Sequence, residues 1–279
     1  MVTEKNNEIK QLSDEVEKNI ANIKHKFIVI SGKGGVGKTT VSVCLAYSLA
    51  LKGYEVGLLD VDIHGPNVNK MVGLTNETLI GDGIRMNPIK VLPNLKVIST
   101  ASIIDNPDIP IIWRGPLKMK LIRQFLADVN WGSLDYLIVD SPPGTGDEPL
   151  SVVQLISDLD GAIVVTTPQE VALLDARKSI QFAKKLGIPF IGVVENMSGL
   201  ICPHCKKNID LFGKGGGKRA AKEMNVNFLG EIPMDLEVIK LCDKGKALAV
   251  LEKNSVVSES IMKITEVIDK YVKSQNVVL

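Results

Sequence analysis

The chain of 279 residues is 45% hydrophobic and 23% charged, values typical of a globular protein that exclude a disordered or collagen-like chain. Its 33 basic and 32 acidic residues leave a formal net charge of +1, so overall charge provides no attraction to nucleic acid or to an anionic membrane. The longest stretch without charged residues, Thr39–Leu51, is too short to cross a bilayer, and the polar N-terminus shows no secretion signal. We therefore expect a cytoplasmic protein without a nucleic-acid or membrane partner.

Residues 1–25 form a polar and charged segment with apolar residues at every third or fourth position. These are Ile9, Leu12, Val16, Ile20 and Ile23. That period places them on one stripe of a helix. The segment is predicted to be an N-terminal helical extension that docks on the domain following it.

Residues 26–279 alternate short apolar runs with longer helical patterns. The runs are Phe27–Ile30, Val56–Asp60, Leu95–Ile98, Tyr136–Asp140, Ala162–Thr166, Phe190–Val194 and Phe228–Ile232. Short buried runs alternating with helices indicate βαβ units. We predict an α/β fold with a mostly parallel, twisted sheet flanked by helices on both faces, and ligands beyond the carboxyl ends of the strands.

A glycine-rich loop follows the first run and leads into an apolar helix. Its sequence, GKGGVGKTT, satisfies the pattern G-x-x-x-x-G-K-[ST] and predicts a single P-loop NTPase domain that binds nucleotide with Mg²⁺. Backbone N–H groups of such a loop point at phosphate oxygens, and the helix dipole adds positive charge. Lys38 is expected to reach the β- and γ-phosphates, Thr39 to ligate Mg²⁺ and Thr40 to lie near the α-phosphate. The predicted nucleotide-binding residues of the loop are Gly32, Gly34, Gly35, Val36, Gly37, Lys38, Thr39 and Thr40.

Carboxylates end two other predicted strands. Asp60 and Asp62 close the second run, and Asp140 closes another run directly before Ser141–Gly144. The second arrangement has the form of a Walker B strand, whose aspartate holds the metal ion. For each aspartate taken alone, a strand-end cap or turn former is the alternative. Together with the phosphate loop they predict a Mg²⁺-nucleotide site.

The cysteines Cys202 and Cys205 form a C-x-x-C pair just past the end of a strand. Two thiolates supply half of a four-ligand site, and the remaining cysteines, Cys44 and Cys242, lie in helical patterns without paired spacing. One pair from each subunit of a symmetric homodimer would give four sulfurs. Spacing alone leaves open a bridged [4Fe–4S] cluster, an intersubunit zinc, a redox disulfide or two unliganded thiols.

The phosphate loop, with its additional lysine Lys33, resembles the deviant Walker A motif of the MinD/ParA/Mrp class of P-loop ATPases. The resemblance implies that Lys33 reaches across a dimer to the partner's nucleotide. It also implies that the second acid of the D-x-D pair, Asp62, positions the attacking water. Both roles fit phosphoryl transfer, which depends on charge stabilisation and in-line positioning.

From about residue 24 to residue 272 the chain resembles the Mrp/ApbC subgroup, which are ATP-dependent iron–sulfur cluster carriers. The matching segments are DVDIHGPN, WRGP, VDSPPGTGDE, TTPQEVALLD, ENMSG followed by CPHC, FGKGGG and LGEIPMD. The resemblance implies that Asn196 and Pro233 line the adenine of ATP. It also implies that Cys202 and Cys205 ligate a labile [4Fe–4S] cluster shared by a homodimer and passed to apo-proteins.

Two other functions compete with the carrier. A MinD- or ParA-like positioning ATPase would need a basic amphipathic anchor, whereas Ser255–Leu279 holds three lysines against three acids. A nucleotide-switched regulator with an intersubunit structural zinc would use the same cysteines without delivering a cluster. The sequence assigns no role to the N-terminal helix, to Arg114 or to His64.

Overall fold

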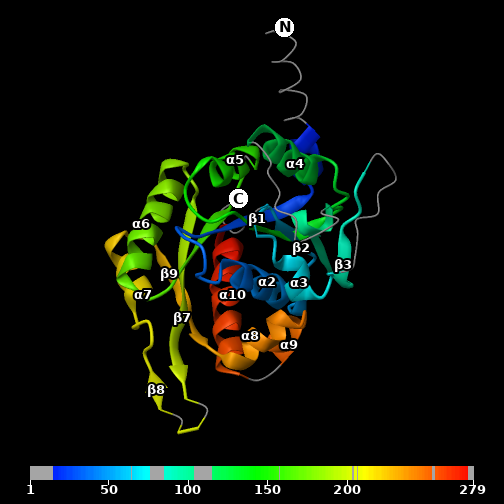
Figure 1. The fold of residues 1–279 in the computed structure, drawn as a ribbon. Helices are drawn as coiled ribbons and strands as arrows, with labels where there is room; N and C mark the ends of the chain where they lie inside the picture. Colours follow the sequence, from blue (N-terminus) through cyan, green and yellow to red (C-terminus); the bar gives the residue numbers. More distant parts are fainter. Residues whose placement is uncertain are drawn as a thin grey trace.

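The computed structural model describes residues 15–63, 65–75, 85–103, 115–156, 158–202, 204–205, 207–252 and 255–275. His64, Arg114 and the first part of the predicted N-terminal extension therefore lie outside the described residues. Figure 1 shows the fold: a central sheet covered by helices, with a narrow β arm projecting from one end.

The sheet has nine strands in the order β3-β4-β2-β5-β1-β6-β7-β8, and β9 pairs with β7. The strands are β1 (Ile23–Ile30), β2 (Val56–Asp60), β3 (Ile89–Leu92), β4 (Leu95–Ser99), β5 (Leu134–Asp140), β6 (Gly161–Thr166), β7 (Phe190–Ile201), β8 (Asn208–Ile209) and β9 (Asn227–Met234). Only the β3–β4 and β7–β8 pairs are antiparallel among these pairings. The predicted mostly parallel α/β sheet is confirmed, and each predicted run lies within an observed strand.

Helices cover the sheet. They are α2 (Lys38–Leu51), α3 (Val68–Val72), α4 (Gly115–Ala127), α5 (Asp147–Leu155), α6 (Glu170–Lys185), α7 (Gly216–Glu223), α8 (Leu236–Asp243), α9 (Leu248–Glu252) and α10 (Val256–Gln275), with residues 15–20 also helical and a 3-10 turn at Thr100–Ile103. None of the described helices combines the length and the apolar character needed to cross a membrane.

Two apolar cores lie on the two faces of the sheet. Phe27 and Val29 of β1 belong to the core that includes residues of α2 and α10, whereas Ile28 and Ile30 belong to the core that includes residues of α4, α5 and α6. This alternation follows from strand geometry, in which successive side chains point to opposite faces. The prediction of helices on both faces is confirmed.

The boundary predicted at residue 25 falls inside β1, which begins at Ile23. The sequence did not mark the start of β1 because charged residues interrupt its apolar pattern. Lys24 and Lys26 lie within the strand, and their ammonium groups form ion pairs with Asp135 and Asp158, both at 2.8 Å. Val16 of the preceding helical segment is buried in the same core as α4. The division of the chain into an extension and a domain otherwise stays a prediction.

The sequence also missed the two antiparallel strands β3 and β8. β3 is a half-exposed edge strand, and β8 has only two residues, both exposed. Neither carries the continuous apolar run that marked the central strands. β8 pairs with the end of β7 and completes the projecting arm.

Candidate functional site

The carboxyl ends of β1, β2 and β5 meet at one edge of the sheet and bring the predicted nucleotide residues together. Val29 of β1 and Asp60 of β2 are both register partners of Asp140 at the end of β5. The glycine-rich loop leaves β1 at this edge, and α2 begins at Lys38. The predicted loop, strand-end carboxylates and helix therefore form one site.

Close packing explains two of the loop glycines. Gly37 has a φ of 83°, and a Cβ added there would lie 2.1 Å from Asn196 Nδ2. A Cβ at Gly32 would lie 2.3 Å from the backbone carbonyl of Asp175. Since no side chain fits at either position, the backbone of the loop can lie directly against β7 and α6.

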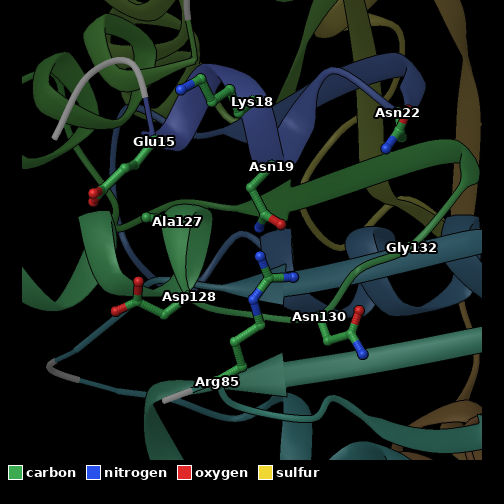
Figure 2. A pocket seen from close by; sticks show the side chains of 9 residues that line it. All are labelled: Glu15, Lys18, Asn19, Asn22, Arg85, Ala127, Asp128, Asn130 and Gly132. Atoms are coloured by element: carbon green, nitrogen blue, oxygen red, sulfur yellow. The ribbon is translucent and has the colours of Figure 1, made fainter. Parts of the chain in front are cut away.

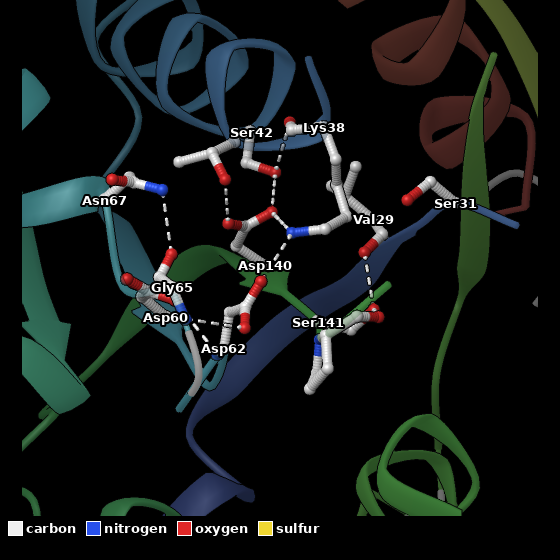
Figure 3. Close-up of polar contacts among 12 residues, drawn as sticks. Val29, Ser31, Lys38, Ser42, Asp60, Asp62, Gly65, Asn67, Asp140 and Ser141 are labelled. Atoms are coloured by element: carbon white, nitrogen blue, oxygen red, sulfur yellow. Dashed lines mark hydrogen bonds and ion pairs between the residues drawn. The ribbon is translucent and has the colours of Figure 1, made fainter. Parts of the chain in front are cut away.

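Asp140 is the centre of a buried polar cluster (Figure 3). Lys38 Nζ lies 2.8 Å from Asp140 Oδ1, and Ser42 Oγ donates to the same oxygen at 2.7 Å. Thr39 Oγ1 donates to Asp140 Oδ2 at 2.8 Å. Asp140 is fully buried, so these donors from the first turns of α2 replace water around its charge.

The residues predicted for Mg²⁺ fit that ion in their chemistry. Thr39 and Asp140 present oxygen atoms, which Mg²⁺ prefers, and the two side chains are already in hydrogen-bond contact. In this structure Lys38 contacts Asp140, and it lines the cavity beside the loop.

The two acids of the D-x-D segment occupy different environments. Asp60 is fully buried and accepts hydrogen bonds from Ser99 Oγ at 2.8 Å and from the Asp62 backbone N–H at 3.0 Å. Burial, with a contribution from neighbouring Asp140, raises the pKa of Asp60 to about 8. Asp62 instead lines the cavity, with Oδ2 3.9 Å from Lys38 Nζ. Only the second acid therefore faces the space beside the phosphate loop.

A cavity of about 350 Å³ lies against the phosphate loop. Beyond the predicted residues, its walls come from Ser31, Pro143, α8, α3 and the residue before α3: Ser31, Asn67, Lys70, Met71, Pro143, Ile239, Cys242 and Asp243. Sequence reasoning missed this wall and gave Cys242 no role at the nucleotide site. No local motif marks it, because it arises where Gly73 and Gly245 allow the end of α3 and the end of α8 to approach closely.

Neither Lys33 nor Asn196 is among the residues that line this cavity. Lys33 is half-buried and is not among the residues that line the cavity, while its carbonyl accepts a hydrogen bond from Ser31 Oγ at 3.0 Å. Asn196 is buried and donates from Nδ2 to the Val36 carbonyl at 2.9 Å. The trans role of Lys33 and the adenine role of Asn196 stay predictions.

Pro233 is not among the residues that line the cavity beside the phosphate loop, although it follows Ile232, the register partner of Asn196. It lines a separate cavity of about 340 Å³ together with Leu200, Asp235 and Val257, at the base of the arm. Asn196 lines neither this cavity nor the one beside the loop. Pro233 and Asn196 are therefore not brought into one cavity, and a shared role at the adenine is untested by this geometry.

Cys202 and Cys205 lie at the arm formed by β7 and β8. Cys202 is half-buried, its backbone N–H donates to the Lys207 carbonyl at 2.9 Å, and Cys205 is exposed. Burial raises the pKa of the Cys44 thiol strongly and that of Cys242 to about 11, so neither is ready to bind metal as a thiolate. Within the ranges that the structure describes, no group of three or more histidine, cysteine or acidic side chains gathers as a metal site.

A third, polar cavity of about 480 Å³ lies at the opposite end of the strands (Figure 2). It lies between the helical segment 15–20, Arg85 and the turn that precedes β5, and its lining includes both acidic and basic side chains. None of the residues predicted for nucleotide or metal lines it. It plays no part in the site described above.

Comparisons with known proteins agree on one family. The family model described as ParA, NUBPL iron-transfer P-loop NTPase, matches residues 22–269. The chain is 50% identical over 256 residues to the iron–sulfur cluster carrier protein of Methanocaldococcus jannaschii, covering 92% of this chain and 88% of the relative. It is 43% identical to the protein of the same name from Saccharolobus solfataricus, covering 96% and 91% of the two chains.

Solved structures show the same architecture. A nucleotide-binding protein of Archaeoglobus fulgidus, determined with ADP and cobalt, is 35% identical, with a TM-score of 0.75 over 85% of this chain and 93% of its own. The MinD cell-division protein of Aquifex aeolicus has a TM-score of 0.64 at 21% identity, over 88% and 97% of the two chains. The second likeness is one of fold alone.

Proposed function

Because this chain belongs to the ParA family of NUBPL-type iron-transfer P-loop NTPases, we propose that it is an ATP-hydrolysing carrier of a labile [4Fe–4S] cluster, which it transfers to apo-proteins. One observation carries the proposal. A P-loop cluster of Lys38, Thr39 and the buried Asp140 occurs in the same body as a cysteine pair at the arm, of which Cys202 is half-buried and Cys205 is exposed. The first is suited to a nucleotide, and the second to a group that must be accepted and released.

In the nucleotide half of the proposal, Lys38 stabilises negative charge on the β- and γ-phosphates of ATP. Thr39 and Asp140 hold Mg²⁺, which neutralises phosphate charge when it is bound. Asp62 faces the cavity and positions the attacking water. Lys33 from a second copy of the chain completes the charge stabilisation, as an arginine finger does in related P-loop enzymes.

In the cluster half of the proposal, Cys202 and Cys205 are the ligands that one copy supplies. A cubane cluster uses four thiolates, so two copies facing each other as a homodimer supply the set. The exposed apolar side chains Ile201, Ile209 and Leu211 near the cysteines, each at least 42% exposed, give a second copy an apolar surface to cover. The proposed location is the cytosol, where a reducing environment keeps both cysteines as thiols.

Anaerobic reconstitution tests this function. Iron, acid-labile sulfide and zinc are measured per chain in the wild type, in Cys202→Ser and in Cys205→Ser, with Cys242→Ala as the matched cysteine control. We expect about four irons and four sulfides per dimer in the wild type and the control, and loss of both in the two arm variants. One tightly held zinc without sulfide would instead favour the nucleotide-switched regulator.

A further inference from the structure

Strand β7 carries a buried carboxylate that the proposed nucleotide chemistry does not use. Glu195 is fully buried and lies between Thr166 of β6 and Glu231 of β9 in the register of the sheet. Among the described residues, no lysine, arginine or histidine forms an ion pair with it. A buried charge without such a partner is costly unless hydrogen bonds compensate it.

Backbone amides provide that compensation. Glu195 Oε1 accepts from the Gly215 N–H at 2.8 Å, and Oε2 accepts from the Gly217 N–H at 2.5 Å. Ser198 Oγ also donates to Oε1, at 2.6 Å. Gly215 is the N-cap of α7, so the positive end of that helix faces the carboxylate.

The glycines of this loop are required by the contact. Gly215 has a φ of 76°, in the left-handed region. A Cβ at Gly217 would lie 3.0 Å from Glu195 Cβ, and a Cβ at Gly216 would lie 2.6 Å from the Pro168 carbonyl oxygen. The glycine cluster therefore lets the backbone close around the side chain of Glu195, and the carboxylate of the protein itself fills the anion cradle that such a loop makes.

Glu195 also lies shortly before β7 continues into the arm, while its pairing with β9 extends to Leu200. The next residue, Asn196, is hydrogen-bonded to the phosphate loop. Met197 then takes a left-handed φ of 58°, and the register between β7 and β9 shifts before Leu200. Beyond this kink β7 pairs with β8, and Cys202 follows at once. One buried side chain is thus anchored between the phosphate loop and the cysteines.

We propose that Glu195 is a positioning residue: held by Gly215 and Gly217, it fixes the base of the arm and sets where Cys202 and Cys205 lie relative to the phosphate loop. The proposal rests on the proposed function of the two cysteines as cluster ligands. It predicts that loosening this anchor frees the arm locally while the sheet around β1 and β5 stays intact.

Two variants and one matched control test it. Glu195→Gln keeps the size of the side chain but turns one acceptor oxygen into an NH₂ group, which cannot accept from a glycine N–H. Gly217→Ala disturbs the same contact from the loop side. Glu231→Gln is the control, because it makes the same change at the register partner in β9. The Glu231 side chain is 44% exposed, lies 3.4 Å from Lys214 Nζ of the loop and accepts from Ser198 Oγ at 3.3 Å. The N–H groups of Gly215 and Gly217 donate to Glu195 instead.

Amide hydrogen exchange of the metal-free protein is the first readout. In Glu195→Gln and Gly217→Ala we expect exchange within residues 196–217 to accelerate about tenfold or more, with β1 and β5 unchanged and the control near wild type. An acceleration spread evenly over the whole sheet would mean general destabilisation, and would overturn the proposal. Unchanged exchange in Glu195→Gln would overturn it as well.

Loss of a reconstituted cluster to a chelator is the second readout. We expect Glu195→Gln to take up the same iron as the wild type but to lose it several-fold faster, whereas Glu231→Gln loses it at the wild-type rate. Equal loss rates in all three proteins would count against positioning. If the wild type takes up no iron, the proposed function fails, and the exchange comparison still decides whether Glu195 holds the arm.

Discussion

Asp140 shows how much of the nucleotide site depends on single side chains. Its buried carboxylate is surrounded by donors from Lys38, Thr39 and Ser42, so each partner compensates a charge that has no access to water. Removing one donor leaves part of the buried carboxylate charge of Asp140 uncompensated. The free energy of unfolding then falls by more than the contribution of the lost hydrogen bond. Asp62 faces the cavity and is 8% exposed, and its Oδ2 lies 3.9 Å from Lys38 Nζ, so it contributes less to this cluster.

Lys38 and Asp62 are expected to fail in different ways. Lys38→Ala removes the cation that is expected to face the phosphates, and it should abolish nucleotide binding. Asp62→Ala should bind a fluorescent ATP analogue within about threefold of wild type but lose phosphate release by about a hundredfold or more, because positioning of the attacking water is lost. Glu252→Ala, an exposed acid on α9, is the control. Phosphate release retained by Asp62→Ala would contradict its assignment.

Cys242 offers a reporter of nucleotide occupancy. It lines the cavity beside the phosphate loop, and burial raises its pKa to about 11. Since only the thiolate is alkylated, its reaction with iodoacetamide should be slow at pH 8 and about tenfold faster at pH 9. Saturating ADP should protect it, whereas the exposed Cys205 keeps reacting. Alkylation of Cys242 at the rate of Cys205, read by mass spectrometry at each site, would contradict this placement.

Among the helices, α10 is attached to the sheet by polar as well as apolar contacts. Asp269, 7% exposed, accepts hydrogen bonds from Tyr54 Oη at 2.7 Å and Tyr136 Oη at 3.2 Å, and from Lys273 Nζ at 2.8 Å. Burial alone would raise the pKa of Asp269, but the hydrogen bonds from Lys273 and the two tyrosines together hold it below its usual value. The ionised carboxylate therefore stabilises the folded protein.

This arrangement predicts a pH dependence of unfolding. Because the pKa of Asp269 is lower in the folded protein than in the unfolded chain, its contribution is complete above the unfolded value of about 3.9 and is lost as the pH falls through the folded value. Asp269→Asn should reduce the free energy of unfolding by about 1–3 kcal/mol at pH 7 and flatten its decline in acid. Glu266→Gln, exposed on the same helix, should do neither. Urea unfolding at several pH values measures both.

The elements differ in how well the sequence alone predicts them. Central strands such as β2 and β6 are buried on both faces, so their apolar runs stand out. The start of β1 is hidden by lysines whose partners lie far along the chain, and β8 is too short to carry a pattern. A pattern confined to neighbouring residues can show a buried strand, but it cannot show an ion pair with a distant one.

The same limit applies to the whole molecule. The phosphate loop is predictable because its chemistry occupies consecutive residues from Gly32 to Thr40. The cavity wall from α3 and α8, and the cradle around Glu195, are made by side chains that only tertiary packing brings together. The family resemblance also implies a cluster shared by two copies. Because each arm holds only two cysteines, this expectation concerns the assembly rather than the single chain.

The assembly should therefore depend on the cluster. With a chain mass of 30.3 kDa, the iron-loaded protein should sediment at twice that mass with about two irons per chain, and a chelator should return it to the mass of one chain. Cys205→Ser should stay at the mass of one chain after the same treatment.

Lys33→Ala, whose cysteines are intact, should still dimerise on iron loading but should lose ATP hydrolysis. Analytical ultracentrifugation with iron analysis decides between these outcomes, and a single chain that holds four irons at 30.3 kDa would contradict a shared cluster.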